Sequence, residues 1–238
     1  MKRSADYYDA FSDGYERGRD RGYHAMIDAL ETETVLPHAA AGRVLEAGCG
    51  TGLILERLGG AGAELFGADL SQGMLRRAAA RGFRVARADL CALPFRNDSF
   101  DAVYSFKVLA HVREIRRAME EMARVTRPGG LVLAEFYNRL SLRHLVRVLK
   151  GARRIARDTT DREVYTRYDG WREILSMAPP GCRIEAVRGV RIWTLLPFLL
   201  RVPLLGRALE ALERRSCDGP LRRFAGFVIL VLRKKADP

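Results

Sequence analysis

The residues most able to do chemistry form a glycine-rich loop, EAGCGTG, at residues 46–52. The loop follows a short apolar stretch and precedes a segment with helical spacing, so it lies where a strand passes into a helix. Glycines at such a junction let the backbone and the helix N–H groups approach a ligand closely. Position 53 is Leu53, whereas the dinucleotide fingerprint G-x-G-x-x-G/A requires a small residue there. The loop therefore predicts a nucleotide-type ligand that is not a dinucleotide.

Two acidic residues follow this loop, each at the end of a predicted strand. Asp69 lies where a carboxylate can accept hydrogen bonds from both ribose hydroxyls of a nucleoside. Asp89 ends the next strand, from which it can reach an adenine amino group. Together with the loop, these acids describe an adenosine ligand without a pyrophosphate. Helix capping by Asp69 and a loop role for Asp89 are the competing interpretations.

Strand and helix patterns alternate through the first part of the chain. Short apolar runs predict strands at 43–48, 63–70, 83–90, 100–106 and 131–137. Helical spacing predicts helices at 51–59, 71–82 and 111–126. The Pro-Gly-Gly sequence at 128–130 predicts a turn. This alternation indicates right-handed crossovers and a parallel sheet with helices on both faces.

The pattern changes after residue 137. Basic and apolar residues recur at helical spacing over 141–157, and 168–178 also has a helical pattern. Apolar runs at 182–192 and 224–234 predict two late strands. About thirty residues separate them, whereas a hairpin needs only about 2–5, so we expect an insertion between these strands.

Five segments in order resemble the motif series of class I S-adenosylmethionine-dependent methyltransferases, and most closely the type 11 small-molecule group. The segments are VLEAGCGTG, GADLSQGML, RADLCALPF, FDAVYSF and RVTRPGGLVLAEF, within residues 44–136. The resemblance implies an α/β fold with a doubly wound, mostly parallel, seven-stranded sheet of order 3-2-1-4-5-7-6. The late strands would be the sixth and seventh, and the seventh would be antiparallel.

The resemblance also implies how the chain is divided. We expect one methyltransferase domain over 1–238, with an N-terminal helical lid at 1–42 and a cofactor-binding core at 43–137. Substrate-side helical insertions would occupy 138–181 and 193–223. The four cysteines are widely spaced, which argues against a disulfide framework or a metal site.

The implied cofactor is S-adenosyl-L-methionine, with S-adenosyl-L-homocysteine as its product. By resemblance, the loop glycines line the methionine moiety, Asp69 holds the ribose, and Leu70 and Met74 flank the adenine ring. The expected cofactor-binding residues are Glu46, Gly48, Cys49, Gly50, Gly52, Asp69, Leu70, Met74, Asp89, Leu90 and Phe106.

His111 is the candidate general base, because it follows the fourth predicted strand and its ordinary pKa suits proton transfer. A packed or capping histidine is the competing interpretation. Nearby, Lys107 would contact an anion or lie on the surface. The segment 104–111 lacks the Asp/Asn-Pro-Pro-aromatic tetrad of enzymes that methylate amide or exocyclic amino nitrogens. Candidate substrate contacts, with helix packing and surface hydrogen bonding as alternatives, are Tyr15, Tyr23, His24 and Tyr168.

The positive charge of the chain is segregated. The formal net charge is +12, from 41 Lys and Arg against 29 Asp and Glu. Residues 1–136 hold 19 of each kind, so the whole excess lies in residues 137–238. A one-sided positive field indicates an anionic partner. Solvated arginines around a core or dimer contact are the competing interpretation.

We therefore expect an enzyme that methylates a small or lipid-like, anionic acceptor on O, N or C. The alternatives are an RNA methyltransferase and a non-catalytic cofactor-binding scaffold. The sequence has no appended RNA-binding module, which argues against nucleic acid as the partner, and the intact loop and acids argue against a scaffold. Without a signal sequence or an apolar stretch long enough to span a bilayer, we expect a cytoplasmic protein with peripheral contact at the inner membrane surface.

Overall fold

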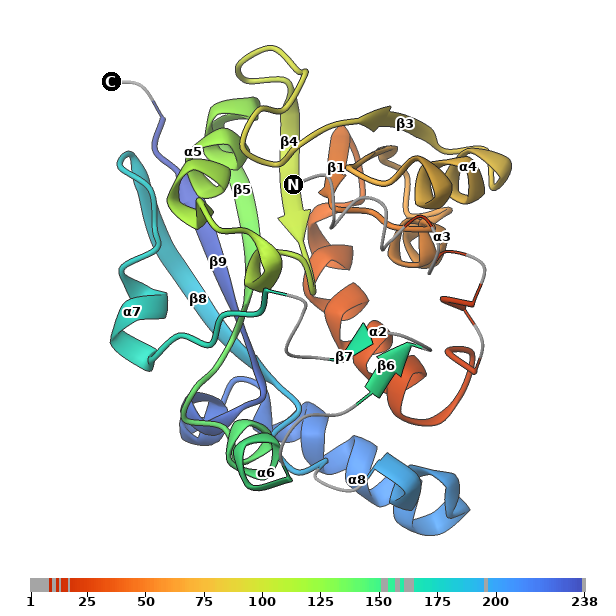
Figure 1. Cartoon of the computed structure of the whole chain (residues 1–238). Coiled ribbons are helices and arrows are strands. Elements are labelled where there is room, and N and C mark those ends of the chain that lie inside the picture. Colours follow the sequence, from red (N-terminus) through yellow and green to blue (C-terminus); the bar gives the residue numbers. More distant parts are fainter. Residues whose placement is uncertain are drawn as a thin grey trace.

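The computed structural model describes residues 9, 12, 14–16, 18–150, 154–156, 159–160, 165–194 and 197–236. A seven-stranded sheet of order β3-β2-β1-β4-β5-β9-β8 runs through its centre (Figure 1). In chain order these are strands 3-2-1-4-5-7-6, as predicted. The strands are β1 (Arg43–Ala47), β2 (Glu64–Asp69), β3 (Arg84–Arg87), β4 (Phe100–Ser105), β5 (Thr126–Tyr137), β8 (Cys182–Val190) and β9 (Phe227–Lys234).

The first five strands pair in parallel, and β9 is antiparallel to both of its neighbours, β5 and β8. Residues 227–232 of β9 are all buried. Their sequence, FVILVL, is continuously apolar because both faces of this strand are covered. The sheet therefore ends in the antiparallel pair that the sequence predicts.

Helices cover both faces of the sheet. The first face packs against α2 (Gly22–Val35), α3 (Leu53–Leu58) and α4 (Gln72–Ala80), and the other against α5 (Ile115–Val125) and α7 (Trp171–Leu175). Val44 belongs to the first apolar core and Leu45 to the second, as expected for consecutive residues of a strand. The parallel strands thus bring their carboxyl ends to one protected edge.

Further elements gather beyond this edge. They are α6 (Leu142–Lys150), β6 (Arg154–Ala156), β7 (Thr159–Thr160), η3 (Pro197–Arg201), α8 (Pro203–Ser216) and η4 (Pro220–Phe224). Figure 1 shows α6 and α8 at the lower end of the molecule, and η3 contacts both α2 and α8. Within the described ranges, no helix combines the length and apolarity that crossing a membrane requires.

Three sequence predictions about elements are wrong. The helix predicted at 111–126 begins at Ile115, and a short 3-10 turn, η2 (Leu109–His111), precedes it. The predicted turn at 128–130 lies inside β5, because the register on β4 shifts between Phe100 and Ala102 and absorbs the extra residues as a bulge.

The helix predicted at 141–157 ends at Lys150, and its sequence continues with Gly151, a residue that disfavours helix. Residues 154–156 instead pair with β7 in a two-stranded ribbon. The exposed side of α6 also differs from an ordinary amphipathic helix, since Leu142, Leu145 and Val148 are exposed.

Candidate active site

The glycine loop between β1 and α3 has a backbone conformation that favours glycine. Gly48, Gly50 and Gly52 all have positive φ angles, of 87°, 53° and 81°. A Cβ on Gly48 would lie 2.4 Å from Val108, so this position requires glycine. The N–H groups of Gly48 and Cys49 both donate to the Ala68 carbonyl, which fixes the loop to the end of β2.

Asp69 connects this loop to the start of α4. Its Oδ2 accepts a hydrogen bond from the Gly50 N–H at 2.8 Å, and its Oδ1 accepts one from the Ser71 N–H at 2.8 Å. Ser71 itself caps α4 by accepting from the Met74 N–H, so helix capping does not account for Asp69. Burial raises the pKa of Asp69, although both hydrogen bonds act in the opposite direction.

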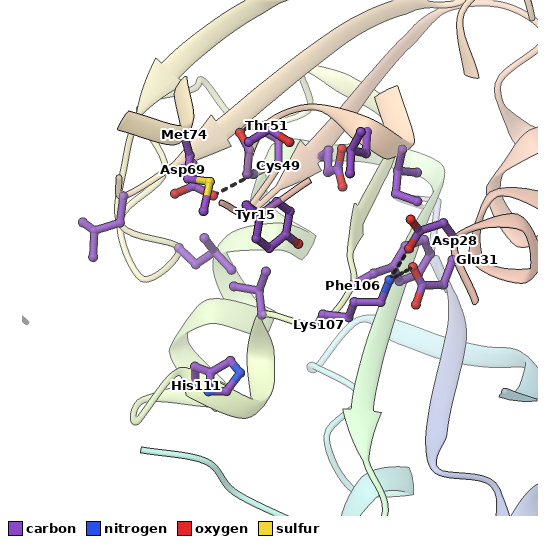
Figure 2. A pocket seen from close by; sticks show the side chains of 18 of the residues that line it. Tyr15, Asp28, Glu31, Cys49, Thr51, Asp69, Met74, Phe106, Lys107 and His111 are labelled. Atoms are coloured by element: carbon purple, nitrogen blue, oxygen red, sulfur yellow. Dashed lines mark hydrogen bonds and ion pairs between the residues drawn. The ribbon is translucent and has the colours of Figure 1, made fainter. Parts of the chain in front are cut away.

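One pocket gathers most of the predicted cofactor residues (Figure 2). Those that line it are Glu46, Gly48, Cys49, Gly50, Asp69, Leu70, Met74, Asp89, Leu90 and Phe106. Gly52 does not line it, because a Cβ there would face Phe83 and Ala78 instead. Asp89 lines the pocket and also accepts a hydrogen bond from the Cys91 N–H, so its pocket and loop positions coexist.

The pocket offers polar groups for an adenosylmethionine-type ligand, and room beside the glycine loop. A Cβ on Gly50 would meet no atom within 4 Å, so the missing side chain leaves room in the pocket wall. Asp69 and Asp89 offer carboxylates at consecutive strand ends. The Tyr104 hydroxyl donates to the buried Glu46 at 3.1 Å. Burial raises the pKa of Glu46 well above its usual range, with this hydrogen bond acting against the shift.

A buried charge network forms the opposite wall of the pocket (Figure 2). Lys107 Nζ lies 2.6 Å from Asp28 Oδ1 and 2.8 Å from Glu31 Oε2, both on α2. Arg19 also pairs with Asp28, at 3.0 Å. Burial lowers the pKa of Lys107, but the two carboxylates outweigh it and raise that pKa above its usual value.

Sequence reasoning missed this network. Lys107 is not a surface charge, and the anions that it contacts are two carboxylates of α2. Its backbone has a positive φ of 61°, and its N–H donates to Glu135. The spacing of Asp28 and Glu31 by three residues places both on one side of a helix, which is the signal that could have indicated a shared partner.

His111 lines the pocket on the side of η2 (Figure 2). Its Nδ1 lies 2.9 Å from the Tyr165 carbonyl oxygen, which fixes the tautomer with hydrogen on Nδ1 and the lone pair on Nε2. Burial lowers the pKa of His111, with the bond to Tyr165 acting the other way. Burial therefore favours the neutral form of the imidazole.

The predicted substrate residues divide into two groups. Tyr15 lies in the pocket, and its hydroxyl-bearing ring is seen between Asp69 and Lys107 in Figure 2. Tyr23, His24 and Tyr168 are not among the residues that line it. Tyr168 instead packs near Tyr137 with ring centroids 5.6 Å apart, and Tyr137 in turn lies 5.9 Å from the His111 ring. An aromatic cluster thus adjoins the pocket.

Two further features complete the site. The four cysteines are unpaired, and Cys49 packs against the position of Gly67, where a Cβ would lie 2.6 Å from its sulfur. Across the part of the chain that the structure describes, no group of three or more His, Cys, Asp and Glu could hold a metal ion. The described residues of the predicted lid at 1–42 contribute Tyr15, Arg19, Asp28 and Glu31 to the pocket wall, whereas residues 1–8, 10, 11, 13 and 17 lie outside the description.

The sequence matches one family profile and several known methyltransferases. The family profile described as a methyltransferase domain matches residues 45–134. A demethylmenaquinone methyltransferase from Corynebacterium efficiens is 31% identical over 168 residues, which cover 67% of this chain and 71% of that protein. The enzyme of that name from Corynebacterium urealyticum is 42% identical over 106 residues, 44% of this chain and 46% of its own. The chain spans about half the length of the first curated relatives it matches.

Solved structures support the same fold. A methyltransferase from Thermotoga maritima has a TM-score of 0.71 at 20% identity, covering 96% of this chain and 98% of that one. DhpI, solved as a complex with S-adenosylhomocysteine, has a TM-score of 0.62 at 19% identity, covering 98% and 96%. With this fold, the matched domain and these relatives, the chain belongs to the class I S-adenosylmethionine-dependent methyltransferases of the type 11 group.

Proposed function

We propose that the protein transfers a methyl group from S-adenosylmethionine to a small-molecule or lipid-linked acceptor. The observation that carries this proposal is that the glycine loop, Asp69 and His111 line one pocket. S-adenosylmethionine supplies an electrophilic methyl group on its sulfonium. The relatives are named demethylmenaquinone methyltransferases, so a demethylmenaquinone-type quinol is the first acceptor to test.

The chain's own residues divide the binding work. Asp69 would accept hydrogen bonds from the ribose, and Asp89 and Leu90 would edge the adenine. The loop glycines and Glu46 would lie along the methionine part. The pocket walls around these residues would hold the reactants in one orientation, which supplies much of the acceleration of a displacement reaction.

His111 would act on the acceptor. A neutral imidazole with its lone pair on Nε2 can take a proton from an acceptor hydroxyl, which raises the electron density of the attacking atom. The carbonyl of Tyr165 would stabilise the resulting imidazolium, because it accepts the Nδ1 hydrogen at 2.9 Å. The network around Lys107 keeps α2 closed over the same pocket.

The alternatives are less well supported. The intact glycine loop and the two acids, Asp69 and Asp89, argue against a non-catalytic scaffold. RNA methylation would use the positive half of the chain, but the aromatic cluster adjoining the pocket is partly buried rather than displayed for stacking with bases. We propose that the protein works in the cytoplasm and meets its acceptor at the inner membrane surface.

The test begins with cofactor binding. Asp69→Ala should weaken binding of S-adenosylhomocysteine by about 1.5–3 kcal/mol, the range for hydrogen bonds to a charged group. Asp69→Asn keeps one acceptor oxygen for the loop and should weaken binding less. Asp218→Ala, at an exposed position just after α8, is the matched control. Unchanged affinity for Asp69→Ala in calorimetry would contradict the assignment of this pocket.

Activity is then measured with labelled S-adenosylmethionine. Reduced demethylmenaquinone, a short-chain quinol and total RNA are offered in parallel, and transfer of label to each is counted. We expect label in a quinol or a related small acceptor and none in RNA. Binding of the cofactor without transfer to any acceptor class would favour the scaffold.

A further inference from the structure

A second cluster, distinct from the cofactor pocket, lies where β5 ends and β9 begins. Two arginines reach it from different elements, Arg143 from α6 and Arg191 from the residue after β8. Both flank Gly226, because their Cδ atoms lie 3.4 and 3.2 Å from the position that a Cβ on Gly226 would take. The two side chains therefore run beside each other over a backbone position that has no side chain.

Aromatic rings surround Arg143. Its guanidinium carbon lies 4.6 Å from the centroid of Tyr137, 4.8 Å from that of Phe227 and 5.7 Å from that of Tyr168. Its Nη1 is fully buried and has no hydrogen-bond partner among the described residues. A guanidinium nitrogen that is removed from water and unpaired is costly, so a structure that retains one favours a partner beyond the described residues.

Arg191 is held in place by an unusual backbone. Its φ of 66° is positive, which residues other than glycine rarely adopt without a functional reason. Its guanidinium lies 4.7 Å from the centroid of Tyr23, and its Nε donates to the Thr194 carbonyl at 3.3 Å. Burial lowers the pKa of Arg191, and the charge of Arg143 acts in the same direction.

No carboxylate of the described residues lies within 4.0 Å of either guanidinium. The contrast with Lys107 is direct, since that buried cation has two carboxylates. Like charges that share a partly buried site raise the free energy of the folded chain until an anion joins them. Rings alone give each cation only a modest attraction, about 0.5–2 kcal/mol.

The cluster adjoins the proposed base. The Tyr137 ring contacts Arg143 on one side and lies 5.9 Å from the His111 ring on the other. Arg143 is also close enough for its charge to lower the pKa of His111, although burial contributes more. An acceptor that presents one atom to His111 could therefore extend across one aromatic ring and reach the arginines.

We propose that Arg143 and Arg191 form an anion subsite, which binds a phosphate or carboxylate group of the methyl acceptor beside an apolar portion packed on the tyrosines. This inference rests on the proposed methyltransferase function and deepens it, because it favours acceptors that carry an oxyanion over a demethylmenaquinone-type quinol, which carries none. Planar guanidinium groups bind oxyanions through paired hydrogen bonds, and two of them provide for the several oxygens of a phosphate. The subsite thus narrows the acceptor class to molecules with an oxyanion about one ring's width from the methylated atom.

The test measures oxyanion binding separately from cofactor binding. Inorganic phosphate, pyrophosphate and benzoate are titrated into the full chain at constant ionic strength, with chloride as the balancing ion. Arg143→Gln and Arg191→Gln should each weaken binding of the preferred anion roughly tenfold or more. Arg207→Gln, an exposed arginine of α8, should leave it unchanged. If pyrophosphate binds more tightly than benzoate, the acceptor carries a phosphate-type group. If benzoate binds more tightly than pyrophosphate, the acceptor carries a carboxylate.

S-adenosylhomocysteine affinity is measured in parallel for every variant and should not change. If the wild type did not bind S-adenosylhomocysteine, that result would contradict the proposed function. If it bound S-adenosylhomocysteine but no oxyanion, that result would overturn the subsite alone. Equal affinity of the wild type and Arg143→Gln for the preferred anion would also overturn the subsite. Should Arg191→Gln fail to fold, Arg143→Gln and Arg143→Lys decide, since lysine keeps the charge but loses the paired geometry and should bind with intermediate affinity.

Discussion

His111 shows how one hydrogen bond defines a chemical role. The Tyr165 carbonyl accepts the Nδ1 hydrogen, so the basic nitrogen is Nε2. Burial keeps the ring neutral by lowering its pKa below the ordinary 6.5. A neutral ring in the pocket wall can accept a proton over most of the physiological range, which a solvent-exposed histidine would do less uniformly.

We expect His111→Ala to lower kcat about 10²–10⁴-fold and to leave the affinity for S-adenosylhomocysteine unchanged. In the wild type, kcat should be constant above pH 6.5 and fall only as the pH drops through the lowered pKa, where the ring gains a proton and stops acting as a base. Steady-state kinetics from pH 5 to 8 measures both. His38→Ala, far from the pocket, is the control. A loss below tenfold in a folded variant would make His111 a packing residue.

At this scale the sequence located residues that line one pocket, because their types follow from backbone requirements, and their cofactor-binding roles stay predictions. Gly48 must adopt a positive φ beside Val108, and a carboxylate must end β2. Arg19 could not be predicted in the same way, because it belongs to a segment without a motif. Asp28 and Glu31 offered only the signal of their three-residue spacing, and their role arises only when α2 packs against the end of β4.

At the scale of elements, the packing of α2 against the end of β4 depends on ion pairs. Lys107 at the end of β4 pairs with Asp28 and Glu31, so it fastens α2 across the edge of the sheet where the pocket opens. Both carboxylates are almost completely buried, at 2% and 0% side-chain exposure. Burial raises the pKa of Glu31 despite the opposing charge of Lys107. Removing the lysine would leave these carboxylates unpaired away from water.

We expect Lys107→Met to lower the free energy of unfolding by about 3–5 kcal/mol, the cost of breaking one side of a buried ion pair. Because Asp28 would then bind a proton more readily, the variant should lose less stability at pH 5 than at pH 8. Urea denaturation at both pH values measures this. Arg84→Met, which breaks the exposed pair with Glu64, should cost less than about 1 kcal/mol. A similar cost for both variants would contradict the fastening role of the network.

The helices and strands were predictable where the hydrophobic periodicity and the length of the segment are clear. All seven strands of the main sheet were located, since most contain a short apolar or alternating stretch. The errors fall where tertiary pairing overrides local signals: the bulge absorbs the Pro128–Gly130 turn into β5, and the ribbon of β6 and β7 replaces the end of a predicted helix. The lid and insertion boundaries remain predictions.

At the scale of the molecule, the part of the chain with the excess positive charge also has exposed apolar side chains. α6, η3 and α8 all belong to the positive second half of the chain, and Figure 1 shows α6 and α8 at the same end of the molecule. Large apolar residues of these elements are exposed, with Leu204 at 82%, Val148 at 62% and Phe198 at 59%. Exposed apolar residues among arginines suit an anionic lipid surface, which would deliver a lipid-linked acceptor to the neighbouring pocket.

We therefore expect the protein to sediment with anionic vesicles and not with neutral ones, and to be released as salt rises from 0.05 to about 0.5 M, because exposed charges are then screened. Leu204→Glu should reduce binding roughly tenfold, since it removes an apolar contact and adds a repelled charge. Leu36→Glu, exposed on another element, is the matched control. Equal binding to both vesicle types, or none, would contradict membrane contact. If Leu204→Glu instead converted a dimer to a monomer in solution, the apolar residues would be a contact between two copies of the chain, and the positive charge would be left to the acceptor alone.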